Sequence, residues 1–205
     1  MLLSTKWAVA LCCCAALLTA RDGFTARLLV GAACNAAGAR ALKRVLAQPR
    51  PAKAKREGAA TYGLPSSHAH LLFFLACSLS AALAGRAVTP APAWATELLP
   101  GARGAAAQAA LLAGAALLSL WRVVIERHTV PQVAAGVVTG SLGALAWDRL
   151  QSLDAALVQR LDAALAELGH THPWQLLAAL LSCCVSGLAA LALVSRDIRP
   201  AGKRA

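Results

Sequence analysis

Long apolar stretches, separated by shorter polar segments, make up most of this chain. A helix of about 20 apolar residues spans the hydrocarbon core of a bilayer. The alternation therefore predicts an all-α integral membrane protein, a helical bundle with about six transmembrane helices. The second stretch is the most polar of the six, because it carries Arg27, Asn35 and Arg40. The stretches are 7–20, 24–42, 69–85, 105–125, 130–147 and 174–194.

The first stretch has a second interpretation, because Lys6 followed by an apolar run is also typical of a signal peptide. Leu18 is a poor residue for the small-residue cleavage site that such a peptide needs. We therefore expect residues 1–20 to be retained as the first helix.

The polar segments between the stretches differ in kind. Residues 48–65 and 86–104 are rich in proline and glycine and are predicted to be loops. Residues 148–173 instead carry leucines at three- or four-residue spacing, which predicts an amphipathic helix in the membrane interface or against the bundle. We expect residues 1–205 to form a single transmembrane domain, with its polar motifs within about 25–148 and a last transmembrane helix at 174–194.

Composition supports a membrane protein and narrows its partners. Hydrophobic residues make up 59% of the chain and charged residues 14%, against about 25% charged in soluble domains. The net charge of +11 comes from residues that flank apolar segments, without the aromatic-rich polar surface typical of nucleic-acid binding. We therefore expect no nucleic acid, and instead anionic lipids or phosphorylated substrates. The seven cysteines lie inside apolar runs without a C-x-x-C pair and are interpreted as packing residues.

Three polar clusters, at 43–51, 65–68 and 122–132, supply most of the chemically useful side chains. Each lies at the end of an apolar stretch. In a bundle whose helices alternate in direction, the loops after the second and fourth helices fall on the same membrane face, so the three clusters are expected to converge. Their cations, hydroxyls and imidazoles suit a site that holds a phosphate and transfers a phosphoryl group.

The first cluster contains Lys43 and Arg50, seven residues apart. Pro49 and Pro51 make a continuous helix through Arg50 unfavourable, so the chain is expected to fold back and bring the two cations together. The alternative for either residue alone is an ordinary positive charge at the end of a transmembrane helix.

The second cluster places Ser66 where serine is a favoured N-cap, just before the third apolar stretch. A helix start attracts anions through its unpaired N–H groups. His68 then falls in the first turn, where it can reach a substrate oxygen. His70, two residues on, points elsewhere on the helix and has a supporting role at most. The alternative is a capped helix with an interfacial histidine.

The third cluster contains Arg122, His128 and Gln132. A six-residue spacing puts Arg122 and His128 on different faces of an unbroken helix, so we expect a bend near 126–131. Gln132, one turn on, could offer its amide oxygen to one ring nitrogen and leave the other free to act as a nucleophile.

In order and internal spacing the three clusters resemble the superfamily of type 2 phosphatidic acid phosphatases and vanadium haloperoxidases. That superfamily carries K-x6-R-P, then P-S-G-H, then S-R-x5-H-x3-D. The corresponding motifs here are Lys43-x6-Arg50-Pro51, Pro65-Ser66-Ser67-His68 and Arg122-x5-His128-x3-Gln132.

The resemblance implies a phosphatase that needs no metal and no other cofactor. It implies that His128 attacks phosphorus to form a phosphohistidine, that His68 protonates the leaving oxygen, and that Gln132 orients His128. The phosphate-binding residues it implies are Lys43, Arg50, Ser66, Ser67 (through its backbone) and Arg122.

The chain departs from the superfamily pattern at Ser67 (for glycine), Trp121 (for serine) and Gln132 (for aspartate). The local sequences Y-G-L-P-S-S-H, Q-P-R-P and H-T-x-x-Q-V are similar to the dolichyldiphosphatase branch, which tolerates glutamine at the position of Gln132. Because a carboxylate is the stronger acceptor, Gln132→Asp is expected from the sequence alone to retain or raise activity.

That branch implies hydrolysis of dolichyl diphosphate to dolichyl phosphate and inorganic phosphate at the lumenal face of the endoplasmic reticulum. The expected partners are thus a polyprenyl diphosphate and the membrane. Positive charge argues for the opposite orientation, because only six of the 20 lysines and arginines fall on the face away from the clusters. The alternatives are a phosphatase for phosphatidic acid or a sphingoid phosphate, or a non-catalytic lipid-binding protein.

Overall fold

The computed structural model describes residues 22–51, 62–88, 91–92, 95–96, 105–172 and 175. Within these residues the protein is all-helical, which confirms the predicted class. The predicted helices at 7–20 and 174–194 lie outside the described residues. The named helices are α2 (Gly23–Leu46), α3 (Ser67–Leu83), α5 (Ala105–Val124), α6 (Val130–Ser152) and α7 (Ala155–Thr171).

Among the described helices, α5 and α6 are long and apolar enough to cross a membrane, and α3 is apolar but shorter. The structure thus supports a membrane protein through two candidate spans, where the sequence predicted about six. The outer faces of both helices carry exposed leucines, among them Leu117 and Leu118 on α5 and Leu142 and Leu145 on α6. An apolar surface of this extent marks a site of membrane or protein contact.

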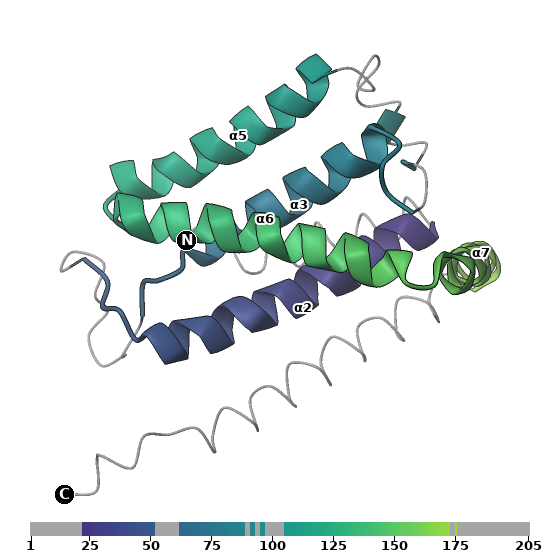
Figure 1. The fold of residues 1–205 in the computed structure, drawn as a ribbon, viewed down its shortest axis with the longest axis horizontal. Helices are drawn as coiled ribbons and strands as arrows, with labels where there is room; N and C mark the ends of the chain where they lie inside the picture. The colour runs from purple at the N-terminus through teal and green to yellow at the C-terminus, as the bar shows by residue number, and fades with distance from the viewer. Residues whose placement is uncertain are drawn as a thin grey trace, which may run out of the picture.

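Four of the helices run side by side, and α7 lies across one end of the bundle, where Figure 1 shows it end-on. Helix α3 is central, because it packs against α2, α5 and α6, most extensively against α6. Successive helices of the bundle alternate in direction. The end of α2, the start of α3 and the α5–α6 turn therefore gather at the end of the bundle away from α7 (Figure 1). This confirms the predicted convergence of the three polar clusters.

Glycines allow α3 and α6 to pack closely. A Cβ atom on Gly136 would lie 2.7 Å from the Ser66 carbonyl oxygen, and one on Gly140 would lie 2.9 Å from the His70 carbonyl carbon. Both distances are shorter than side-chain contacts allow, so only glycine fits at these positions. Further along the bundle, Phe74 is fully buried in an apolar cluster with Ala32 and Ala144.

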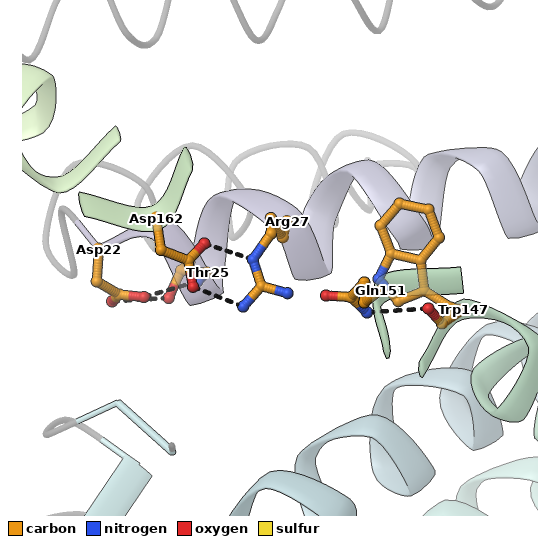
Figure 2. Close-up of polar contacts among 6 residues, drawn as sticks. All are labelled: Asp22, Thr25, Arg27, Trp147, Gln151 and Asp162. Atoms are coloured by element: carbon orange, nitrogen blue, oxygen red, sulfur yellow. Dashed lines mark hydrogen bonds and ion pairs between the residues drawn. The ribbon is translucent and has the colours of Figure 1, made fainter. Parts of the chain in front are cut away.

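Helix α7 confirms the predicted amphipathic segment, although α6 extends to Ser152 and takes up the first part of it. An ion pair joins α7 to the first turns of α2. Figure 2 shows the Arg27 guanidinium facing the Asp162 carboxylate, with Nη2 donating to Oδ2 at 2.8 Å and Nε donating to Oδ1. Nearby, Asp22 caps α2 by accepting from the Thr25 backbone N–H at 2.6 Å. The leucines Leu157 and Leu161 of α7 remain about half exposed.

Candidate active site

The end of α2 positions the first two cations. The helix stops at Leu46 because Ala47 adopts the left-handed conformation (φ 46°) and Pro49 follows. The chain then turns and pairs with the segment before α3, where Gly63 N–H donates to the Gln48 carbonyl at 2.7 Å. Arg50 Nε donates to the Tyr62 carbonyl at 3.3 Å in the same pairing. Arg50 is thereby folded back toward the helix that carries Lys43, as the two prolines predicted.

The start of α3 places Ser66 and His68 at the same end. Ser66 is the N-cap residue and is fully buried, yet its hydroxyl has no hydrogen-bond partner among the described residues. His68 lies in the first turn and is partly exposed, and the side chain of Ser67 is exposed. The first turn of any helix leaves backbone N–H groups without intrahelical partners, which is the feature expected of Ser67 as a phosphate-binding residue.

The turn between α5 and α6 confirms the predicted bend. Helix α5 ends at Val124, and Glu126 adopts a positive φ of 54°. The chain then folds over the helix end, where the backbone N–H groups of Arg127 and His128 both donate to the Arg122 carbonyl, at 3.0 and 3.2 Å. This turn brings His128 above Arg122, although their spacing would separate them on a continuous helix.

Gln132 holds His128 in a defined orientation. His128 Nδ1 lies 3.2 Å from Gln132 Oε1, and both side chains are buried, with 3% and 2% exposure. Thr129 N–H donates to the same oxygen at 3.3 Å, and Gln132 Nε2 donates to the Pro49 carbonyl at 3.0 Å. A backbone N–H can only donate and a carbonyl can only accept, so these two contacts fix which end of the amide is oxygen.

It follows that the nitrogen facing Gln132 must carry a proton. Nδ1 of His128 is the donor, and in the neutral ring Nε2 is left with its lone pair free. This is the tautomer that a histidine nucleophile needs, and the orienting role predicted for Gln132 matches the geometry.

The surroundings keep His128 neutral. Burial, opposed in part by the Gln132 hydrogen bond and reinforced by the charges of Arg50, Lys43 and Arg122, lowers the pKa of His128 from 6.5 to about 4. The same three cations act electrostatically on His68. The structure therefore brings together both histidines and all three cations that the sequence singled out.

Arg122 also has an N–H group that can donate a further hydrogen bond. Its Nε is buried and has no hydrogen-bond partner among the described residues. A buried guanidinium N–H without a partner is costly, and the oxygen of a phosphate would satisfy it with a charge-assisted hydrogen bond. The unpartnered Ser66 hydroxyl at the same end of the bundle is a second donor of this kind.

The sequence did not predict the contacts that the Gln132 amide nitrogen makes. Gln132 Nε2 donates to Gln48 Oε1 at 3.3 Å as well as to Pro49, and a Cβ atom on Gly63 would lie 2.6 Å from Gln132 Cδ. The amide thus joins the first motif to the third. The glutamine in place of the family's aspartate was the available signal, because only an amide can donate here.

The described residues contain no group of three His, Cys, Asp or Glu side chains placed to hold a metal ion. The charges that act on His128 are instead those of three cations, which bind anions.

A neutral buried histidine among cations at one end of a helical bundle is suited to binding an anion such as a phosphate. Residues 24–153, well over half of the chain and including all three motifs, match the PAP2 superfamily, and the chain belongs to it. Membership indicates a phosphatase of lipid phosphates. No curated protein and no solved structure matches the chain.

Proposed function

We propose that this protein is a dolichyl (polyprenyl) diphosphate phosphatase that works through a phosphohistidine. The observation that carries the proposal is the fixed Nδ1–H tautomer of His128, which leaves a neutral Nε2 beside three cations. Family membership supports a lipid phosphate as the substrate. The sequence around Tyr62, Pro49 and Gln132 supports the dolichyl diphosphate branch.

In the first step, His128 Nε2 attacks the terminal phosphorus and the bond from phosphorus to the bridging oxygen breaks. His68 gives its proton to that oxygen, and dolichyl phosphate leaves. Lys43, Arg50 and Arg122 balance the charge on the phosphoryl oxygens, which are also in reach of the Ser66 hydroxyl and the Ser67 backbone.

In the second step, water attacks the phosphohistidine. His68, now without its proton, accepts one from the water, and the N–P bond breaks. Inorganic phosphate leaves, His128 Nε2 regains its lone pair, and both histidines return to their starting protonation states. Within this scheme the protein supplies charge stabilisation through side-chain cations.

The apolar faces of α5 and α6 suit a polyprenyl chain that stays in the lipid while its diphosphate reaches the end of the bundle. We place the protein in the endoplasmic reticulum membrane, with helices at 7–20 and 174–194 completing a bundle of about six. The site then faces the lumen. A glycosylation sequon between residues 52 and 61 tests this orientation, because only lumenal acceptors are modified. Modification of a sequon at 97–104 instead would reverse it.

The decisive experiment measures phosphate release by the purified protein in detergent, from dolichyl diphosphate, phosphatidate and a sphingoid phosphate in parallel. We expect turnover of the diphosphate to be the fastest. Faster release from phosphatidate would assign another substrate within the same superfamily. No release from any of the three by a folded protein would favour a non-catalytic lipid-binding protein.

A further inference from the structure

His70 is the second histidine of the P-S-S-H-A-H segment and takes no part in the proposed phosphoryl transfer. It is nearly fully buried, at 4% exposure, inside an apolar bundle. Both of its ring nitrogens nevertheless have polar partners on other helices. Nδ1 lies 2.8 Å from Thr139 Oγ1 on α6, and Nε2 lies 3.0 Å from the backbone carbonyl of Asn35 on α2.

The chemistry of these partners fixes the protonation state of the ring. The Asn35 carbonyl can only accept, so His70 Nε2 must carry a proton. The Thr139 hydroxyl has one proton and three candidate acceptors, which are His70 Nδ1 at 2.8 Å, the Ala135 carbonyl at 2.7 Å and the Gly136 carbonyl at 3.4 Å. If that proton went to either backbone carbonyl, Nδ1 would also have to donate and the ring would be a buried cation, which is costly between apolar helices.

The neutral ring with Thr139 donating to Nδ1 avoids that cost. His70 then donates to α2 and accepts from α6, while its own backbone belongs to α3. The His70 side chain therefore links α2, α3 and α6. Each of these three helices has one end at the candidate active site.

The contacts of His70 with Asn35 and Thr139 lie close to the proposed catalytic residues. His70 N–H donates to the Ser66 carbonyl at 2.9 Å in the first turn of α3, and Ser66 N–H donates to the Gln132 carbonyl at 2.8 Å. His68 is two residues away in the same turn. Any shift of His70 between α2 and α6 would move His68 relative to His128.

We propose that His70 is a positioning residue that sets the distance between His68 and His128 by holding α3 to Asn35 and Thr139. The proposal rests on the proposed phosphatase function, because its effect is on the alignment of the two histidines with a phosphoryl group. It concerns geometry and not phosphate binding, so it predicts a loss in kcat with little change in KM.

The test compares Thr139→Val, which keeps the side-chain shape and removes the hydroxyl, with Thr139→Ser, which retains it. The matched control is Ser119→Ala. It removes a hydroxyl that is fully buried, whereas Thr139 is partly buried, and its bond at 2.7 Å goes to Ala115 within α5. All are assayed as full-length protein in detergent, with kcat, KM and melting temperature measured on dolichyl diphosphate.

We expect Thr139→Val to lower kcat by about tenfold or more, since a misplacement of about 1 Å can cost about 100-fold. KM should change by less than about twofold, Thr139→Ser should restore most of kcat, and Ser119→Ala should behave as the wild type. His70→Gln, which keeps a donor for the Asn35 carbonyl, serves as the second variant and should also lose kcat.

Failure of the positioning role can be distinguished from failure of the proposed function. An active wild type with an equally active, folded Thr139→Val or His70→Gln variant overturns the positioning role and leaves the proposed function intact. A loss of melting temperature in Thr139→Val matched by an equal loss in Ser119→Ala, with equal kcat in both, also overturns it. A wild type that releases no phosphate from any lipid overturns the proposed function and the positioning role together.

Discussion

His128 Nδ1 and Gln132 Oε1 are 3.2 Å apart, and the polarity of this hydrogen bond is set by what lies on the other side of the amide. Gln132 Nε2 donates to Gln48 Oε1 and to the Pro49 carbonyl. A carboxylate at this position could accept from His128 but could not donate to either oxygen. The structure therefore reverses the expectation drawn from the sequence for Gln132→Asp.

We expect Gln132→Asp to lower kcat. The shorter side chain retreats from His128, and a carboxylate at this buried position faces two acceptor oxygens, at a cost of about 1–3 kcal/mol or roughly 5- to 150-fold. Gln132→Glu, which keeps the length, is the matched control and should also lose activity. Phosphate release measures both, and activity at or above the wild-type level in Gln132→Asp would show that acceptor strength outweighs the lost donors.

His128→Ala should abolish phosphate release, because no other group takes the place of Nε2. Rapid quenching of the wild type with a phosphate-labelled substrate should trap label on the protein that is stable in base and lost in acid, as a phosphohistidine is. The control is His170→Ala, because His170 is exposed on α7 at the other end of the bundle. Trapped label in His128→Ala would place the nucleophile elsewhere.

The lowered pKa of His128 gives a prediction for acid conditions. Its ring should stay neutral in the substrate-free protein down to about pH 4, whereas an ordinary histidine protonates near 6.5. Ring-labelled histidine NMR in detergent, with His128→Ala to assign the signal, measures this directly. A midpoint near 6.5 would mean that burial and the neighbouring cations do not act as described.

The same shift predicts a direction for stability. The unfolded chain binds a proton at His128 near pH 6.5 and the folded protein does not until about pH 4. The contribution of His128 to stability is therefore fully present above pH 6.5 and is lost as the pH falls toward 4. The melting temperature of the wild type should fall more steeply over this window than that of His128→Ala.

Gly140→Ala should damage both folding and activity. The new Cβ would lie 2.9 Å from the carbonyl carbon of His70 and closer still to its oxygen. This backbone cannot move without shifting α3, so we expect a loss of about 1–3 kcal/mol. Gly114→Ala on α5 is the matched control. Its Cβ meets nothing within 4 Å, so it should be neutral or stabilise by about 0.5–1 kcal/mol. Thermal unfolding and phosphate release measure both, and equal behaviour would contradict the close packing of α3 on α6.

Chelation by EDTA should leave phosphate release unchanged, because side-chain cations supply the charge that a metal ion would otherwise provide. Lys43→Ala and Arg122→Ala should each reduce activity under the same conditions. Loss of activity in EDTA that added Mg²⁺ restores would assign the site to a different chemistry.

The sequence predicted the described helices because apolar runs bounded by proline-rich segments leave few alternatives. It predicted the bend before His128 because the Arg122–His128 spacing does not fit one helix face. It predicted the contact of Gln132 with His128, but not those with Gln48 and Pro49, which depend on how the chain turns after α2. It could not predict the partners of His70, because these lie on α2 and α6 and depend on how close the glycines of α6 let α3 come. The boundary between α6 and α7 was also missed, since leucines continue across it without a break in pattern.

The Arg27–Asp162 ion pair has a consequence for biosynthesis. The two residues are 135 positions apart, so Arg27 leaves the ribosome long before its carboxylate partner does. The ion pair between α2 and α7 can therefore form only after α7 has been made. This late contact lies at the end of the bundle opposite the candidate active site (Figure 1).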